Sequence, residues 1–211
     1  MSMLPTFIML ALFIMIFKMQ GLGDKGEVYD DTERKTEVVL ITSAVGGAGK
    51  TTLALGIGQA LAKEYKRVLY VDAETINTFQ CRLGDVASLP ASNVASVFTA
   101  LDSSYEKIKP YIIHGNIDYI PPFATSLVSM GIDETIYRRI VEDAKKTSEY
   151  DLILVDTNSA FDLNKAFWLE SADRVLIVTE TTPQAIYSTN KLLENISIAN
   201  KGKFFFLFLL I

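Results

Sequence analysis

The sequence is poor in the residues that build disulfide frameworks and soft-metal sites. Its 211 residues include one cysteine, Cys81, and one histidine, His114. A single cysteine cannot form an internal disulfide, and together with one histidine it cannot supply the ligands of a structural zinc site. We therefore assign both residues to packing or to the surface. The lack of disulfides favours a cytoplasmic location.

Positive charge is also scarce. The chain has 20 Lys and Arg against 25 Asp and Glu, which gives a formal net charge of −5. This balance excludes a protein whose whole surface is built for nucleic acid. The basic residues of the 135–146 segment alternate with Glu142 and Asp143, as on a solvated helix face, so nucleic acid is not an expected partner.

A long and almost wholly apolar run stands near the N-terminus. Residues 3–19 are almost wholly apolar, with no charge before Lys18. The run is short against the ~20 residues that span a bilayer, and it lacks the basic start and the small-residue cleavage site of a secretory signal. Three interpretations of segment 1–19 remain open. It is a membrane anchor, because basic residues follow it, or a remnant of an upstream domain, or an artefact of where the reading frame begins.

The rest of the chain has the composition of one folded domain. Hydrophobic residues make up 49% and charged residues 21%, which excludes wholesale disorder. Residues 20–36 carry glycines and alternating charges without apolar periodicity and are predicted to be a solvated linker. Residues 37–211 are predicted to form the domain.

Short apolar runs alternate with amphipathic segments in this domain. The alternation predicts βαβ units, and thus an α/β fold of three layers with a mostly parallel central sheet. The predicted strands are 38–42, 67–72, 118–120, 152–156 and 174–179, and the predicted helices are 51–66, 135–146 and 182–196.

The C-terminal residues 203–211 read KFFFLFLLI. A continuous apolar run of this kind is typical of a parallel strand that is buried on both faces. Because the sequence stops inside the run, we expect a domain that is incomplete at its C-terminus.

A glycine-rich segment follows the first predicted strand and opens the first predicted helix. Its glycines allow backbone N–H groups to point inward, the helix start adds positive potential, a lysine reaches the terminal phosphates and a threonine hydroxyl holds Mg²⁺. The pattern predicts a P-loop for ATP or GTP with Mg²⁺, although Ala44 stands where the strict pattern has glycine. The predicted nucleotide-binding residues are Gly46, Gly47, Ala48, Gly49, Lys50, Thr51 and Thr52.

Two further apolar strands end in a carboxylate. Asp72 closes RVLYVD and Asp156 closes LILVD. At the carboxyl ends of parallel strands both would lie at the edge where open α/β sheets bind ligands. We predict Thr51 and Asp156 as the Mg²⁺ ligands; the alternative for each aspartate is a turn or a helix cap.

Four segments carry a family resemblance that covers residues 37–199. They are SAVGGAGKTTLALGIGQALA, KRVLYVDAE, EYDLILVDTNSAF and ADRVLIVTETTPQAI. In this order they resemble the ParA/MinD group of P-loop ATPases with a deviant Walker A motif. Within that group, Ile120–Phe123 and the lysine replacement described below are most similar to the TadZ/CpaE branch, which localises pilus-assembly machinery.

The resemblance implies ATP and Mg²⁺ as cofactors and assigns catalytic roles to Lys50, Asp72 and Glu74. Asp156 aligns with the Walker B aspartate. Where the family has a D-x-D switch, this chain has Asp72-Ala73-Glu74, and Val45 replaces the signature lysine that reaches a dimer partner's phosphate. Hydrolysis is therefore expected to be slow or absent. The sequence also stops before the family's purine-recognising asparagine.

The resemblance favours a nucleotide-dependent positioning or assembly ATPase of bacteria. Its expected partners are nucleotide, a second copy of the chain, and pilus or secretion-system proteins, with membrane contact through residues 3–19. Two alternatives remain. A bacterial tyrosine autokinase domain shares this lineage and often follows a membrane segment, and a non-hydrolysing scaffold would explain Val45 and Glu74.

Overall fold

The computed structural model describes residues 35–63, 67–74, 105–121, 135–199 and 204–210, together with Phe79, Ser129 and Gly131. The predicted segment 1–19, most of the predicted linker, Cys81 and part of the 120–123 motif lie outside the described residues.

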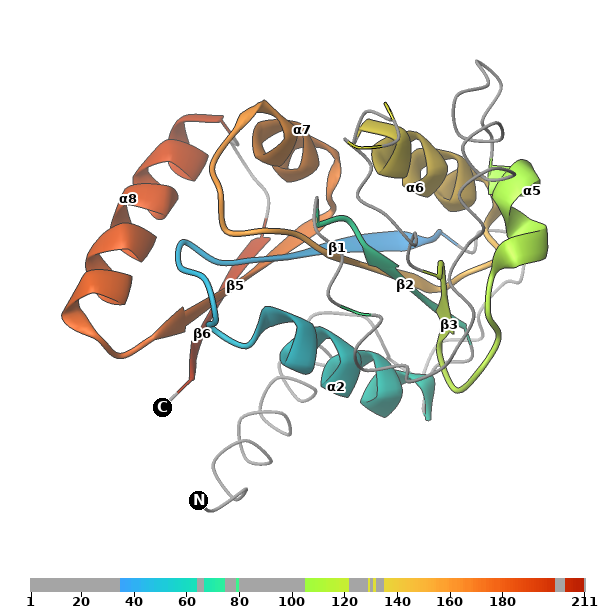
Figure 1. Cartoon of the computed structure of the whole chain (residues 1–211), viewed down its shortest axis with the longest axis horizontal. Coiled ribbons are helices and arrows are strands. Elements are labelled where there is room, and N and C mark those ends of the chain that lie inside the picture. The colour runs from blue at the N-terminus through green and yellow to red at the C-terminus, as the bar shows by residue number, and fades with distance from the viewer. Residues whose placement is uncertain are drawn as a thin grey trace.

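The described chain forms a six-stranded sheet with helices on both faces (Figure 1). The strand order is β3-β2-β4-β1-β5-β6, and every paired neighbour is parallel. The strands are β1 (Glu37–Thr42), β2 (Val68–Asp72), β3 (Asp118–Tyr119), β4 (Leu152–Asp156), β5 (Arg174–Glu180) and β6 (Phe204–Leu210). The helices are α2 (Lys50–Ala62), α5 (Tyr105–Ile108), a 3₁₀ turn (Lys109–Tyr111), α6 (Thr135–Thr147), α7 (Leu163–Ser171) and α8 (Pro183–Ala199).

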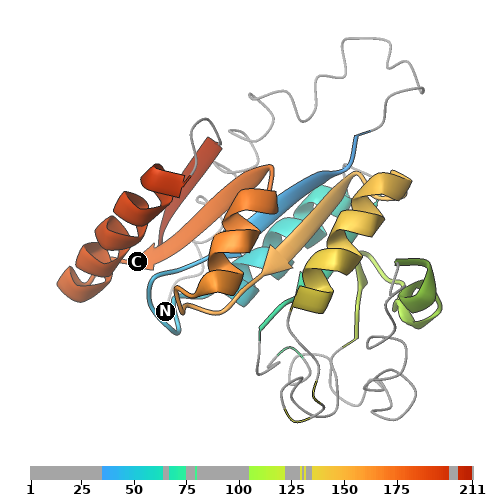
Figure 2. The same ribbon diagram turned by 90° about the horizontal axis from the view of Figure 1, so that it is seen from above.

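Alternate residues of the central strands pack into two separate cores. Val38 and Leu40 of β1 pack with α6, α7 and α8, whereas Val39 and Ile41 pack with α2. Successive strand side chains point to opposite faces, so a strand covered on both sides must be apolar throughout. Figure 2 shows α6, α7 and α8 side by side over one face of the sheet. The predicted α/β fold of three layers with a parallel sheet is confirmed.

The predicted strands and helices correspond closely to the observed ones. The predicted strand 203–211 is β6, which pairs along its whole length with β5, from Arg174 beside Phe204 to Glu180 beside Leu210. The predicted helix 51–66 begins one residue earlier, at Lys50, and ends at Ala62.

The sequence analysis did not predict α7. This helix has nine residues, and its Asp162 cap accepts a hydrogen bond from the Lys165 N–H at 2.9 Å. Its buried side chains are Lys165, Trp168 and Leu169, so a lysine interrupts the apolar face by which an amphipathic helix is recognised.

The residue before β1 is already part of the packed domain. Thr36, the last residue of the predicted linker, is 1% exposed, and its hydroxyl donates to the Tyr150 carbonyl at 2.6 Å.

In the described part of the chain, no helix combines the length and the apolar character that a bilayer crossing requires.

Candidate phosphate-binding site

The sheet order brings the predicted site residues to one edge. Strand β4 lies between β2 and β1, and Asp156 is in register with Asp72 on one side and with Ile41 on the other. All three strands are parallel, so their carboxyl ends meet at the same edge. The glycine-rich loop that follows β1 therefore begins beside both aspartates.

The loop between β1 and α2 is open toward this edge. Gly47 and Gly49 have φ values of 76° and 86°, a left-handed conformation that glycine adopts without strain. A Cβ built on Gly46 or Gly47 would meet no atom within 4 Å. Among the described residues no side chain caps the start of α2, so its first N–H groups keep the capacity to bind an anion.

The other predicted binding residues, Ala48, Thr51 and Thr52, differ in how far their side chains are buried. The Ala48 side chain is 3% exposed and packs in the core beneath α2, so only its backbone can serve a ligand. Thr52 is exposed and Thr51 is partly buried. Ala48 thus shapes the loop through its backbone, whereas the side chains of Thr51 and Thr52 are at least partly accessible.

Lys50 is the first residue of α2, and its side chain is 7% exposed. Its ammonium lies 3.5 Å from the Ser159 hydroxyl and 3.8 Å from Glu74 Oε1. Ser159 belongs to the loop after β4, and Glu74 to the loop after β2. The structure therefore brings the predicted catalytic residues Lys50 and Glu74 together.

Asp156 is fully buried, and one of its carboxylate oxygens lacks a partner. The Tyr70 hydroxyl donates to Oδ2 at 3.0 Å, whereas Oδ1 has no hydrogen-bond partner among the described residues. Burial raises the pKa of Asp156 to about 6, and the Thr51 hydroxyl opposes this rise. An orphaned buried oxygen beside a threonine hydroxyl fits a hard divalent cation such as Mg²⁺, which takes oxygen ligands.

Asp72 is 3% exposed and shapes the loop after β2. Its Oδ1 accepts a hydrogen bond from the Glu74 N–H at 3.0 Å, which is the pattern of an aspartate turn. The pKa of Asp72 is raised to about 8, chiefly by burial and also by the carboxylates of Asp156 and Glu74. Asp72 is thus held within the chain, while the Glu74 side chain reaches Lys50.

The sequence analysis missed Lys165 and Ser159 as members of this edge. Lys165 is buried on α7, and its ammonium donates to the hydroxyls of Thr42 and Thr157 at 2.6 and 2.8 Å. One signal was available: Lys165 stands three and four residues before two large apolar residues, the spacing of one helix face. A lysine on such a face is expected to have polar partners.

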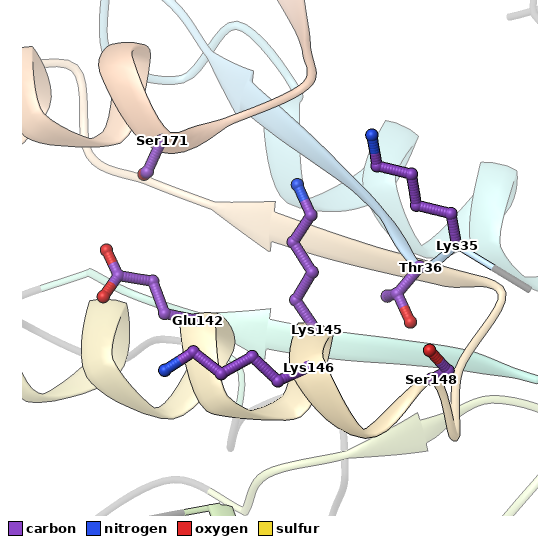
Figure 3. A pocket seen from close by; sticks show the side chains of 7 residues that line it. All are labelled: Lys35, Thr36, Glu142, Lys145, Lys146, Ser148 and Ser171. Atoms are coloured by element: carbon purple, nitrogen blue, oxygen red, sulfur yellow. The ribbon is translucent and has the colours of Figure 1, made fainter.

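A separate hollow of about 690 Å³ lies at the opposite edge of the sheet (Figure 3). It is lined by Lys35, Thr36, Glu142, Lys145, Lys146, Ser148 and Ser171. Both oxygens of Asp173 hold the Lys145 ammonium, at 2.7 and 2.6 Å, and Asp143 holds that of Lys146 at 2.9 Å. These lysines are paired and lie near the amino ends of the strands, so the hollow is distinct from the phosphate-binding loop.

Most of the described domain, the phosphate-binding loop included, matches one protein family. Residues 36–204 match the family described as AAA domain. The chain belongs to this AAA-domain family. Among curated proteins it is 26% identical over 173 residues to the septum site-determining protein MinD of Thermotoga maritima, covering 78% of the chain and 60% of that protein. It is also 26% identical over 171 residues to the sporulation initiation inhibitor protein Soj of Bacillus subtilis, covering 78% of the chain and 66% of Soj.

Solved structures agree with this placement. A ParA family ATPase from Chlorobium tepidum superposes with a TM-score of 0.66 at 25% identity, over 81% of this chain and 73% of that one. The MinD protein of Pyrococcus horikoshii, solved with Mg-ADP, gives a TM-score of 0.63 at 22% identity over 81% and 68% of the two chains. By its fold, this AAA-domain chain is therefore similar to P-loop ATPases of the ParA/MinD type.

A third solved structure shares the fold alone. The kinase domain of the Escherichia coli tyrosine kinase ETK gives a TM-score of 0.64 at 20% identity, over 95% of this chain and 74% of that one. The AAA-domain chain spans 60% and 66% of the lengths of the two curated relatives.

Proposed function

We propose that this ParA/MinD-type chain binds ATP with Mg²⁺ and uses the bound nucleotide to control assembly with a second copy and with protein partners. The observation that carries the proposal is the meeting of two buried charged groups at one sheet edge. They are the Lys50 ammonium, at the start of α2, and the unpartnered Oδ1 of Asp156.

Most of the predicted residues have a role in the proposal. The backbone of residues 46–49 cradles the phosphates, and Lys50 binds the terminal ones. Thr51 and Asp156 hold Mg²⁺, which when bound offsets the negative charge of the phosphates. Asp72 fixes the loop that carries Glu74 through the hydrogen bond to the Glu74 N–H.

Glu74 is proposed to orient the attacking water if ATP is hydrolysed. Its carboxylate lies 3.8 Å from the Lys50 ammonium, so it already faces the site. A glutamate carries its carboxylate one methylene further from the backbone than an aspartate, and a displacement of about 1 Å can cost about a hundredfold in rate. With Val45 offering no second ammonium, we propose slow turnover.

The proposed biological role is that of a positioning or assembly factor. The named relatives are a septum site-determining protein and a sporulation inhibitor, and both names describe the control of where or when cells assemble a structure. The resemblance to the TadZ/CpaE branch points to pilus or secretion machinery as the partner. Nucleotide binding would change the conformations of the loops that follow Asp72 and Asp156, and these changes would alter partner binding.

Calorimetry with Mg-ATP on wild type, Lys50→Ala and Lys63→Ala tests the proposal. Lys63 is exposed just beyond the last residue of α2 and is the matched control. We expect the wild type and Lys63→Ala to bind alike, and Lys50→Ala to lose at least about tenfold in affinity because a charged hydrogen bond is removed. Equal binding by all three proteins would refute the assignment.

Phosphate release and light scattering then separate the alternatives. A positioning ATPase should hydrolyse ATP slowly and dimerise with it. A scaffold should show nucleotide-dependent thermal stabilisation without phosphate release. An autokinase domain should transfer phosphate to its own tyrosines, which anti-phosphotyrosine detection after incubation with Mg-ATP would reveal.

A further inference from the structure

Lys165 is a buried ammonium at the nucleotide edge with no role in the function proposed above. Its side chain is 2% exposed. It donates to Thr42 Oγ1 at 2.6 Å, to Thr157 Oγ1 at 2.8 Å and to the carbonyl of Asn158. A lysine ammonium has three N–H donors, so all three are used. Lysine is almost never fully buried unless it is paired, and here its partners are neutral oxygens.

These three contacts join the ends of two strands to one loop. Thr42 ends β1, Thr157 follows β4, and Asn158 lies in the loop between β4 and α7. The Thr157 hydroxyl accepts from Lys165 and donates to the Ile41 carbonyl at 3.2 Å, which completes the junction. Lys165 thus holds the start of this loop against α7 and against the carboxyl ends of β1 and β4.

The fastened loop leads directly to the phosphate-binding lysine. Ser159 follows Asn158, and the Ser159 hydroxyl lies 3.5 Å from the Lys50 ammonium. In a P-loop the lysine reaches the terminal phosphates, whereas the loop backbone holds the inner ones. A change in the position of Ser159 therefore acts at the terminal-phosphate end of the site.

We propose that Lys165 is a positioning residue that holds the loop after β4 against the terminal phosphate and thereby makes the site prefer a nucleoside triphosphate to a diphosphate. The proposal rests on the nucleotide-binding function proposed above and adds to it. Lys165 acts through Asn158 and Ser159, and its own donors stay with the protein.

The charges around Lys165 make this anchor sensitive to the ligand. The pKa of Lys165 is lowered to about 7, chiefly by burial and also by Lys50 on α2, while the carboxylates of Asp162 before α7, Asp156 on β4 and Glu74 after β2 oppose the decrease. Added phosphate charge would favour the protonated ammonium. In the free protein the anchor is therefore partly lost as the pH rises through about 7, and triphosphate restores it.

Calorimetric affinities for Mg-ATP and Mg-ADP in wild type, Lys165→Met and Lys191→Met test this inference. Lys191 is half exposed on α8 and pairs with Glu194, so it is the matched control. Lys165→Met should lose about tenfold in ATP affinity, the size of one charged hydrogen bond, and change ADP affinity by less than about threefold. Lys191→Met should match the wild type for both nucleotides.

The pH profile gives a readout that a purely structural role would not move. Between about pH 6 and pH 9 the preference for ATP over ADP should fall further in the wild type than in Lys165→Met, because both proteins keep Asp72 and Asp156 but only the wild type titrates this ammonium. Thr157→Val, which removes one acceptor, should shift the preference in the same direction as Lys165→Met and covers the case in which Lys165→Met does not fold.

Three results would overturn the inference. They are equal losses for ATP and ADP, no loss for either, and a wild-type pH profile in a folded Lys165→Met protein. If the wild-type protein binds neither nucleotide, the proposed function itself fails, and this outcome is distinct from a wild type that binds both without a contribution from Lys165.

Discussion

Asp156→Asn should stabilise the metal-free protein at alkaline pH while it removes the response to Mg-ATP. Asp156 is 0% exposed, and burial raises its pKa from 3.8 to about 6. The folded state therefore binds this proton more tightly than the unfolded chain, and the folded protein loses stability as the pH rises from about 3.8 to about 6. Asparagine carries no charge and escapes this loss.

The magnitude follows from the two pKa values. At about pH 8 the charged carboxylate costs about 3 kcal/mol, and at about pH 5 the cost falls to roughly half of that, because each tenfold change in proton affinity is worth 1.36 kcal/mol. The new amide also leaves an N–H group without a partner, at a cost of about 1–3 kcal/mol at either pH. The difference between variant and wild type should therefore shift by roughly 1–2 kcal/mol in favour of the variant between the two pH values.

Urea unfolding in the presence of EDTA at these two pH values measures this shift. The cost of the unpaired amide is the same at both pH values and therefore cancels. Asp143→Asn is the control, because Asp143 pairs with Lys146 on the surface at 2.9 Å and such pairs are worth about 0–1 kcal/mol. Saturating Mg-ATP should then stabilise the wild type by about 2.7 kcal/mol at a hundred times its dissociation constant and leave Asp156→Asn unchanged. A pH-independent difference, or an unaltered response to Mg-ATP, would refute the reasoning.

Four other substitutions have expected outcomes in the same unfolding assay. Gly47→Ala should cost about 1–3 kcal/mol, because an alanine is strained at a φ of +76°, whereas Gly56→Ala inside α2 has open space and should gain about 0.5–1 kcal/mol. Tyr70→Phe removes the hydroxyl that donates to Asp156 at 3.0 Å, so it should raise the pKa of Asp156 and move the pH dependence toward higher pH. Trp168→Ala should cost about 3–5 kcal/mol, because this side chain is 3% exposed in the core beneath α7.

The strands and the glycine loop could be predicted because their physical causes are local. A strand covered on both faces must be apolar at every position, and the runs that end in Thr42, Asp72 and Asp156 have this property. The spacing of Gly47, Gly49 and Lys50 likewise encodes a turn that leads into a helix. Parallel pairing then places the strand ends at one edge, as the sequence analysis expected.

The contacts of Lys165 could not be predicted, because they depend on packing between distant segments. The residue is 123 positions from Thr42, and the two meet only because α7 packs over β1. The sequence analysis recognised no helix there, since a buried lysine broke the apolar pattern. The pairing of Lys50 with Glu74 has the same origin, because it depends on how the loops after β2 and β1 fold back over the sheet edge.

Burial disfavours the charged forms of several groups at the site, and a bound ligand of opposite charge would stabilise those charged forms. Burial raises the pKa values of Asp72 and Asp156 and lowers that of Lys165, so all three groups are less stable in their charged forms than they would be in water. An anion beside the two lysines and a cation beside Asp156 would each favour the charged form of the nearest group. Mg-ATP supplies both at once, so its binding should be cooperative with the protonation of Lys165 and the ionisation of Asp156. Magnesium alone would stabilise only the charged form of the aspartate, and ATP without magnesium would stabilise only those of the lysines. We therefore expect magnesium alone, and ATP alone, to bind more weakly than Mg-ATP.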